Sequence, residues 1–194
     1  MSFLFNKLSG FYDAFMKNTG LSNEELLLDY IGDLEGQKVA DVGGGTGTLA
    51  KIMHHRNAEV TIIDPSTSMT QIALKKCPGL KVINAAAENI PVENNYFNVV
   101  CMRDCLHHIR SKQDTVKEAA RILKHEGRIV IQEFRPSSVI SKLIYVFERS
   151  LGEKTVLVEP EELVEMMKCN GIHGQITNVS SFEYVFSGVK EWGE

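Results

Sequence analysis

Two adjacent histidines, His107 and His108, are the side chains of this sequence best suited to proton transfer. Imidazole titrates near neutral pH, so a histidine can take a proton from a hydroxyl, a thiol or a ring carbon. The pair follows an apolar run, Phe97–Met102, that is typical of a buried strand. Ligands of open α/β sheets bind beyond the carboxyl ends of such strands. Both histidines are therefore candidate catalytic residues, although packing or a structural hydrogen bond is the favoured alternative for at least one of them.

A glycine-rich segment, Val39–Gly47, follows another apolar run and carries the strongest signal for ligand binding. Glycines permit a tight turn and let a ligand approach the backbone closely. Asp64 ends the next strand-like run, Glu59–Asp64, at the position where an acid binds ribose hydroxyls in nucleoside-binding α/β folds. The order of strand, loop, helix, strand and acid favours a nucleoside site over a merely structural turn.

The spacing within this glycine segment distinguishes two classes of ligand. Dinucleotide loops usually read G-x-G-x-x-G and place a pyrophosphate at the N-terminus of the next helix. Here the pattern is Asp41-x-Gly43-x-Gly45-x-Gly47. A carboxylate beside the loop repels a pyrophosphate but attracts a cation, such as the ammonium group of a methionine moiety. The pattern therefore disfavours a nicotinamide-dependent oxidoreductase.

Strand-like runs and helical patterns alternate along the chain around these candidate residues. The expected strands span 38–42, 59–64, 80–84, 97–102 and 127–132, and the expected helices begin after Ser22 or Asn23 and span 47–55, 68–76, 111–124 and 160–169. Such alternation implies parallel strands joined by right-handed crossovers, and continuous apolar strands imply a sheet covered on both faces. Two further strands, near 174–179 and 182–187, are expected to close one edge as a hairpin. The predicted fold is a doubly wound, Rossmann-like α/β sandwich with a mostly parallel seven-stranded sheet and an antiparallel C-terminal hairpin strand.

The length of 194 residues and an ordinary globular composition indicate a single domain, 1–194. Within it we expect an N-terminal helical lid over 1–35 and a cofactor-binding core over 36–134. The remaining segment, 135–194, is expected to shape the acceptor side and to carry the hairpin.

Charge, hydropathy and cysteine usage argue against a nucleic-acid-binding, membrane-spanning or secreted protein. A net charge of −4 without a basic cluster argues against nucleic acid as a partner. No apolar window is long enough for an integral membrane segment. The chain has 4 cysteines without CxxC spacing and no signal-peptide pattern, so we expect a cytoplasmic protein, either a monomer or a homodimer.

Several segments, in order and in spacing, resemble the class I S-adenosylmethionine-dependent methyltransferases. VADVGGGTGTLA resembles their first motif, and TIIDPS resembles their second-strand acid. Asn84–Ile109 and Glu118–Phe134 resemble two later stretches of small-molecule methyltransferases. The FYDAFM start and the Glu133–Pro136 stretch are most similar to the ubiquinone/menaquinone-biosynthesis C-methyltransferases (methyltransferase type 11). The combination is far more specific than any one motif.

This resemblance implies S-adenosyl-L-methionine as the methyl donor, S-adenosyl-L-homocysteine as the product and a small-molecule or lipid-like acceptor. The residues that it implies for the cofactor are Asp41, Gly43, Gly44, Gly45 and Gly47 at the methionine end, Asp64 at the ribose, Pro65 and Met69 on the adenine face, Ala87 and Glu88 at the adenine edge, Arg103 after the fourth strand, and Tyr12 in the lid. No metal ion is expected.

Some of these residues have a structural interpretation that is open at this point. Met69 suits a core position, Glu88 a solvated surface, Arg103 an ion pair with Asp104, and Tyr12 the anchor of a helix. Ala86 stands where the family often has an Asp that binds the adenine amino group.

The sequence says less about how the methyl acceptor would bind than about how the cofactor would bind. Methyl transfer from a sulfonium needs mainly alignment and desolvation, and a base is not obligatory. A cofactor-binding protein without its own catalysis, acting as a sensor or partner subunit, is therefore the alternative function. A helical spacing of apolar residues suits either an apolar acceptor pocket or core packing, and its members are Ile140, Leu143, Ile144 and Phe147. Cys101, within an apolar strand, is expected to be a buried and inert thiol.

Overall fold

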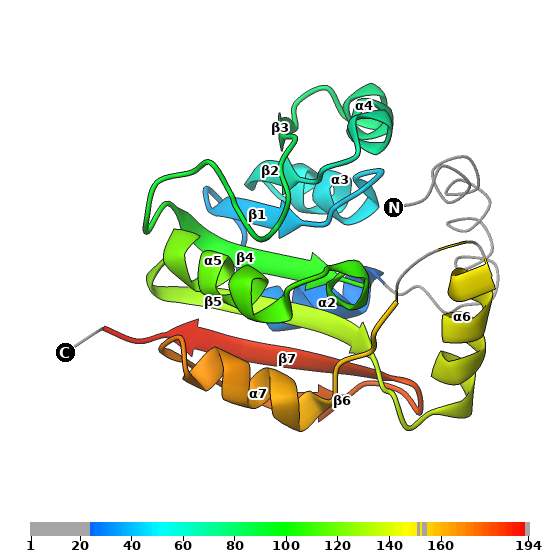
Figure 1. The fold of residues 1–194 in the computed structure, drawn as a ribbon. Coiled ribbons are helices and arrows are strands. Elements are labelled where there is room, and N and C mark those ends of the chain that lie inside the picture. The colour runs from blue at the N-terminus through cyan, green and yellow to red at the C-terminus, as the bar shows by residue number, and fades with distance from the viewer. Residues whose placement is uncertain (1–23, 151, 153–154, 193–194) are drawn as a thin grey trace.

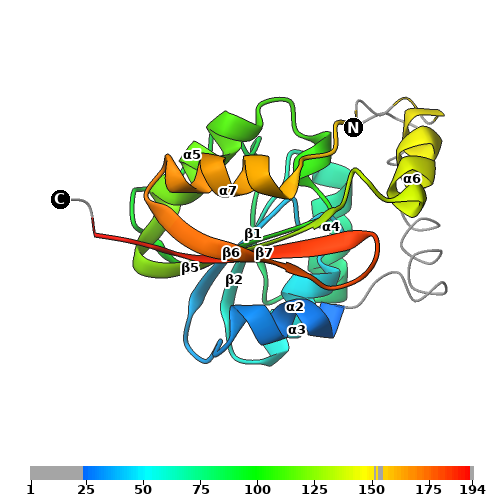
Figure 2. The same cartoon turned by 90° about the horizontal axis from the view of Figure 1, so that it is seen from below.

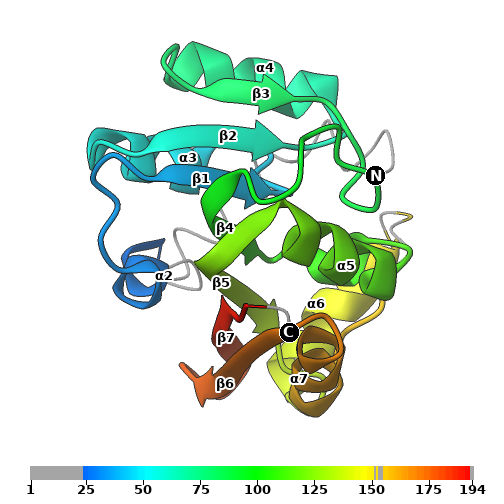
Figure 3. The same ribbon diagram turned by 90° about the vertical axis from the view of Figure 1, so that its left-hand side faces the viewer.

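The computed structural model describes residues 24–150, 152 and 155–192, in which helices cover both faces of one twisted sheet (Figure 1). The strands are β1 (Lys38–Val42), β2 (Glu59–Ile63), β3 (Lys81–Ile83), β4 (Phe97–Arg103), β5 (Leu123–Phe134), β6 (Ile172–Asn178) and β7 (Glu183–Lys190). Their order across the sheet is β3-β2-β1-β4-β5-β7-β6, which can be followed from top to bottom in Figure 3.

Strand direction divides the sheet into two parts. Strands β1 to β5 pair in parallel, whereas β7 runs antiparallel to both β5 and β6. The C-terminal hairpin thus closes one edge by inserting β7 between β5 and β6. The predicted doubly wound fold with an antiparallel C-terminal strand is confirmed.

The helices are α2 (Glu24–Ile31), α3 (Thr48–His55), α4 (Thr67–Lys76), α5 (Lys112–Ile122), α6 (Val139–Ser150) and α7 (Pro160–Lys168), with a short 3-10 turn η1 (Leu106–His108). Figure 2 shows α5 and α7 on one face of the sheet and α2 and α3 on the other. Alternate residues of each central strand serve the two faces, as the period of a strand requires. In β4, for example, Val100 packs with the α5 and α7 side, and Val99 with the α2 and α3 side.

Local chemistry fixes where the helices begin and end. Ser66 caps α4 by accepting the Met69 N–H at 3.4 Å, and Ser111 caps α5 by accepting the Asp114 N–H at 3.3 Å. At the other end of α5, the Lys190 ammonium donates to the Leu123 carbonyl at 2.8 Å. The helix ends at Ile122, two residues before the predicted end, because β5 already begins at Leu123.

Two segments differ from the sequence-based expectation. The N-terminal lid was expected over 1–35, but 1–23 lie outside the described residues, and Leu27 and Ile31 of α2 are fully buried against the sheet. Helix α6 stands beyond the carboxyl ends of the strands instead of covering a face (Figures 1 and 2). The alternative of core packing is wrong for Leu143 and Phe147, which are 66% and 50% exposed.

Candidate functional site

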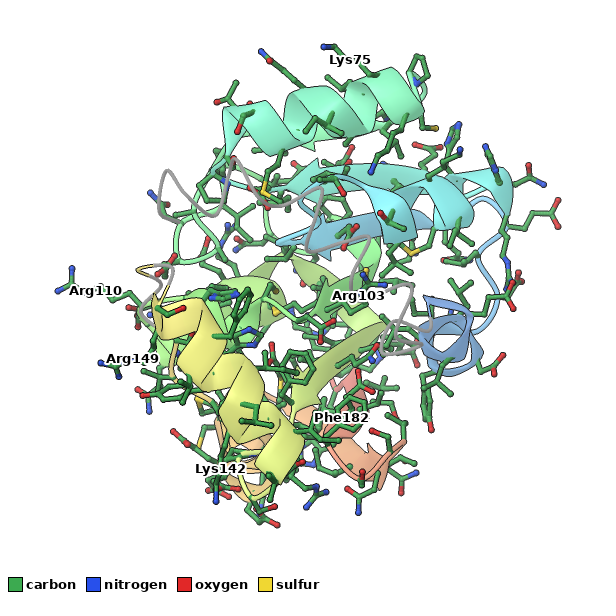
Figure 4. All side chains as sticks on the ribbon, turned by 90° about the vertical axis from the view of Figure 1, so that its right-hand side faces the viewer. Lys75, Arg103, Arg110, Lys142, Arg149 and Phe182 are labelled. Carbon is green, nitrogen blue, oxygen red and sulfur yellow. The ribbon has the colours of Figure 1, made fainter. Side chains whose placement is uncertain are left out.

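The carboxyl ends of four parallel strands meet at one edge of the sheet, and Figure 4 looks onto this edge. The register places Val42 of β1 level with Ile63 of β2 and with Met102 of β4. It also places Arg103 of β4 level with Gln132 of β5. The edge therefore brings together the glycine loop, the acid after β2 and the histidines after β4, which the sequence had predicted to share a site.

The glycine loop after β1 requires glycine for two different reasons. Gly43 has a φ of +73°, a backbone conformation that favours glycine. A Cβ there would lie 2.5 Å from the Cβ of Cys105, just after β4, so no larger side chain fits at this position. Gly47 also has a positive φ, and its Cβ would lie 2.7 Å from the Ala73 Cβ of α4. These two glycines therefore allow close packing around the loop, whereas Gly44 and Gly45 lie beside the candidate ligand-binding side chains Asp41 and Met69.

Asp64 joins the glycine loop to the loop after β2. Its Oδ2 accepts the Gly45 N–H at 3.0 Å, and its Oδ1 accepts the Ser66 N–H at 2.8 Å. Burial raises the pKa of this fully buried carboxyl, and the two backbone hydrogen bonds act in the opposite direction. Each carboxylate oxygen can accept a second hydrogen bond, so the donor set is compatible with the predicted ribose hydroxyls.

Asp41 is the most unusual acid of the cofactor side. It is buried at 2% exposure, and its Oδ2 has no hydrogen-bond partner among the described residues. Burial raises the pKa of Asp41 to about 6, and the charge of Arg103 opposes that effect. A Cβ on Gly44 would lie 2.6 Å from this Oδ2, so only glycine leaves the oxygen uncovered on that side. The arrangement suits a ligand ammonium, which would donate a hydrogen bond to Oδ2 and add a second positive charge to that of Arg103.

The residues predicted for the adenine lie on α4 and on the segment after β3. Met69 is 7% exposed, and its Cε would lie 3.1 Å from a Cβ on Gly45, so the thioether lines the glycine loop. Pro65 is exposed and Ala87 is buried. Glu88 accepts the Ser111 N–H at 3.4 Å, at the N-terminus of α5. Such a carboxylate stabilises a helix start, so Glu88 has a structural role in addition to its predicted place at the adenine edge. Tyr12 lies outside the described residues.

The segment after β4 carries an acid that the sequence analysis considered only as an ion-pair partner. Asp104 has a φ of +48°, a conformation that few residues other than glycine adopt. Its Oδ2 lies 3.7 Å from Nε of Arg103, and burial raises its pKa to about 7 despite that charge. Its Oδ1 has no hydrogen-bond partner among the described residues. The left-handed backbone and a buried carboxylate oxygen without a hydrogen-bond partner among the described residues together mark Asp104 as a functional candidate.

His107 forms a close and fully buried side-chain pair at this edge. Its Nδ1 lies 2.5 Å from Glu133 Oε2, and both side chains are at most 1% exposed. Glu133 Oε1 accepts the N–H groups of Cys105 and Leu106 at 3.1 and 2.7 Å. Burial opposes ionisation of Glu133, but the His107 charge and these hydrogen bonds outweigh it and lower its pKa. Glu133 thus fixes both the His107 ring and the backbone of the turn η1 to which His107 belongs.

His108 differs from its neighbour in exposure. It is half-buried, and its ring centroid lies 4.2 Å from that of His107. The Val156 N–H donates to the His107 carbonyl at 2.9 Å, so the segment after α6 also packs against this turn. Of the two predicted candidates, His108 is the one that a ligand at this edge can reach more readily.

Sequence reasoning did not identify Glu133 as part of the site. An acid at the end of an otherwise apolar strand was the available signal, since a fully buried glutamate nearly always has a partner. Gln132 beside it donates to Glu183 of β7 at 2.8 Å, which extends the polar cluster across the hairpin. Cys101 is buried as expected. Burial is the main cause that raises the pKa of its thiol well above the usual value, and the charge of the nearby Asp41 acts in the same direction. That thiol is therefore neutral and unreactive.

Comparison with known proteins connects this geometry to a family. Residues 40–131 match a family model described as a methyltransferase domain. The demethylmenaquinone methyltransferase of Tropheryma whipplei is 28% identical over 167 residues, which cover 84% of this chain and 63% of that protein. A ubiquinone/menaquinone biosynthesis C-methyltransferase of Campylobacter jejuni is 30% identical over 104 residues, covering 50% of this chain and 44% of that protein. The chain therefore spans less than two thirds of the length of these relatives.

Solved structures share the fold over nearly the whole chain. A chain in the complex between the Haloferax volcanii Trm112 methyltransferase activator and the putative methyltransferase superposes with a TM-score of 0.83 at 16% identity, covering 97% of this chain and 98% of that one. A Thermotoga maritima S-adenosylmethionine-dependent methyltransferase, described as a possible histamine N-methyltransferase, gives 0.77 at 21% identity, covering 98% and 100%. Residues 40–131 thus match a methyltransferase domain, the fold is Rossmann-like, and the chain, as predicted, resembles the class I S-adenosylmethionine-dependent methyltransferases of ubiquinone and menaquinone biosynthesis.

Proposed function

We propose that this protein transfers a methyl group from S-adenosyl-L-methionine to a lipid-like small molecule and releases S-adenosyl-L-homocysteine. The observation that carries the proposal is the buried Asp41 carboxylate, whose Oδ2 has no hydrogen-bond partner among the described residues and which lies beside Gly44. A cationic amino group suits this oxygen, because it would donate the absent hydrogen bond and because a buried charge is costly unless it is well paired. A pyrophosphate would instead be repelled.

The residues present fit this cofactor along its length. Asp41 would bind the methionine ammonium, Asp64 the ribose hydroxyls, and Met69 with Pro65 the adenine face. When bound, the cofactor would supply an electrophilic methyl group on a sulfonium sulfur. Gly45 N–H holds the Asp64 carboxylate in place before any ligand arrives. The site is therefore preorganised for the nucleoside half of the cofactor.

The chain's own contribution to the reaction would be alignment, desolvation and the removal of a proton. The acceptor atom bonds to the methyl carbon as the bond from that carbon to sulfur breaks, and the acceptor then loses a proton. His108, half-buried at the end of β4, is our candidate for receiving that proton, and Asp104 with its pKa near 7 is the second candidate. His107, fixed by Glu133, would act as a positioning residue for this turn. Alignment supplies the larger share of the rate.

The acceptor class is inferred from relatives together with the acceptor side of the molecule. The relatives named above act, by their names, in the methylation of demethylmenaquinone or in ubiquinone and menaquinone synthesis. We therefore propose an aromatic, lipid-like acceptor for this chain as well. Helix α6, with its apolar side chains, stands at the same end of the sheet as the candidate site (Figure 1).

Calorimetric titration with S-adenosyl-L-homocysteine, with NAD as the control ligand, tests the cofactor. We expect micromolar binding of the first and none of the second. Failure to bind S-adenosyl-L-homocysteine by a folded protein would overturn the proposal. Methyl transfer from labelled S-adenosyl-L-methionine to a demethylated quinol then tests the acceptor, and cofactor binding without transfer to any acceptor of a broad panel would favour the non-catalytic alternative.

A further inference from the structure

Helix α6 is fixed to the rest of the molecule along one side. Ser141 is fully buried, and its hydroxyl donates to the Phe182 carbonyl at 3.1 Å. The Arg135 N–H, just before the helix, donates to the same carbonyl at 2.8 Å. Figure 4 shows Phe182, in the turn between β6 and β7, beside the helix. This side of α6 is therefore anchored to the hairpin, and the opposite side faces outward.

The outward side of α6 is a stripe of large apolar side chains. Residues three, four and seven positions apart share one face of a helix, and five large apolar residues of α6 are related by these spacings. The members and their exposed fractions are Val139 71%, Ile140 38%, Leu143 66%, Val146 62% and Phe147 50%. Single exposed apolar residues are ordinary, whereas a contiguous stripe marks an interaction surface. We call these residues the α6 stripe.

Basic side chains border the α6 stripe. Lys142 and Arg149, seven residues apart on the same side of the helix, are both exposed. Arg110 after η1 is exposed too, and Figure 4 places it on the same side of the view as Arg149. The chain as a whole has a net charge of −4. These exposed basic side chains thus place positive charge beside the α6 stripe on an acidic protein, and an anionic surface is their natural counterpart.

We propose that the α6 stripe inserts into the surface of a lipid bilayer that contains anionic headgroups. A helix with an apolar face flanked by Lys and Arg lies in the plane of the membrane interface, with its apolar side chains among the acyl chains. A second copy of this chain is a poorer occupant, because stripe-to-stripe contact would bring the Lys142 and Arg149 charges of both copies together. Headgroup phosphates would neutralise those charges instead.

The position of α6 connects the membrane surface with the candidate site. The helix follows β5, whose end carries Glu133, and the segment that returns from it contains Val156, which bonds to the His107 carbonyl. A bilayer on the α6 stripe would therefore lie against the acceptor end of the sheet, where a lipid-like acceptor would arrive. This inference rests on the proposed function for its acceptor class, but binding to the bilayer can be measured without any methyl transfer.

Cosedimentation of the full chain with vesicles tests the inference directly. We would compare vesicles of phosphatidylcholine alone with vesicles that contain about three-tenths phosphatidylglycerol. Each Lys or Arg near an anionic surface contributes on the order of a fivefold change in binding, so Lys142→Glu with Arg149→Glu should weaken binding to the anionic vesicles at least about tenfold. Leu143→Ser with Phe147→Ser should weaken it by about tenfold or more through the loss of buried apolar area.

Helix α4 supplies matched controls on the same chain. Lys75→Glu with Lys76→Glu makes the same charge change on exposed lysines, and Ile72→Ser with Leu74→Ser replaces apolar residues that are 39% and 37% exposed. We expect both control variants to bind the anionic vesicles as the wild type does. Equal losses in the α4 and α6 variants would overturn the inference, because they would indicate a nonspecific effect of charge or hydrophobicity.

Two other outcomes would also overturn it. One is the absence of binding to the anionic vesicles by the folded wild type. The other is a wild-type dimer that Leu143→Ser with Phe147→Ser converts to monomer, which would make a second copy the occupant. S-adenosyl-L-homocysteine titration of the same samples separates the two proposals. If the protein binds S-adenosyl-L-homocysteine but not the anionic vesicles, only the membrane inference is wrong. If it binds the vesicles but not S-adenosyl-L-homocysteine, only the proposed function is wrong.

Discussion

The two halves of the carboxyl edge are built in different ways. On the cofactor half, the site consists of a glycine loop, the acid Asp41 that precedes it and the acid Asp64 after the next strand. Asp64 accepts the N–H of Gly45, which lies 19 residues earlier in the chain. On the acceptor half, the key contact joins His107 to Glu133 across two strands, and the next layer is a helix with an apolar outer face. On the cofactor half, the glycine-loop backbone positions the acids. On the acceptor half, the site depends on side chains that come together only when the chain has folded.

The largest effect should come from breaking the buried pair on the acceptor half. Glu133→Ala leaves His107 and the two turn N–H groups without their acceptor, so we expect the free energy of unfolding to fall by about 3–5 kcal/mol in urea denaturation. Glu133→Gln, which keeps an oxygen acceptor, should lose less and still bind S-adenosyl-L-homocysteine with wild-type affinity. A fully stable Glu133→Ala variant would show that the pair contributes little to the fold.

The next effect concerns binding on the cofactor half. Asp64→Ala removes the acceptor of the Gly45 and Ser66 N–H groups, so S-adenosyl-L-homocysteine should bind at least about 30-fold more weakly, or roughly 2 kcal/mol. Calorimetric titration measures the change, and Asp29→Ala, on the exposed side of α2, is the matched control. Unchanged affinity in Asp64→Ala would remove Asp64 from the site.

A third prediction uses the pH dependence of stability. Because burial raises the pKa of Asp41 from 3.8 to about 6, the charged carboxylate is disfavoured in the fold. Its stabilising contribution is full below pH about 4 and is lost as pH rises through about 6, at up to about 1.4 kcal/mol per unit of pKa shift. Asp41→Asn should therefore show a smaller decline in the free energy of unfolding between pH 4 and 7 than the wild type. Parallel curves for the two proteins would contradict this.

The smallest effect separates the two interpretations of Glu88. Its carboxylate accepts the Ser111 N–H at the start of α5, so Glu88→Gln should cost about 0.5 kcal/mol of stability through the lost charge at a helix N-terminus. Affinity for S-adenosyl-L-homocysteine should stay within about threefold of the wild type. A tenfold or greater loss of affinity would instead give Glu88 the predicted role at the adenine edge.

The same contrast explains what could be predicted from the sequence. Hydrophobic periodicity predicted the strands and their parallel pairing, and the glycine loop suggested where a cofactor would bind, because each of those signals spans only a few residues. The pairing of His107 with Glu133 could not be predicted, since the two residues are 26 apart and meet through the register of β4 and β5. The helical spacing within α6 was visible in the sequence, but the outward direction of its apolar face was not, because the same spacing suits a buried face.

Proton release on cofactor binding tests the placement of a ligand amino group beside Asp41 most directly. An ammonium beside Asp41 should lower the pKa of that carboxyl, so binding near pH 6 should release about half a proton per site. Titrations with S-adenosyl-L-homocysteine in two buffers of different ionisation enthalpy measure this number, with Asp41→Asn as the comparison. We predict release by the wild type, and no release with weaker binding by Asp41→Asn. Equal affinity and equal proton release in both proteins would contradict the placement of the amino group at Asp41, and with it the central claim.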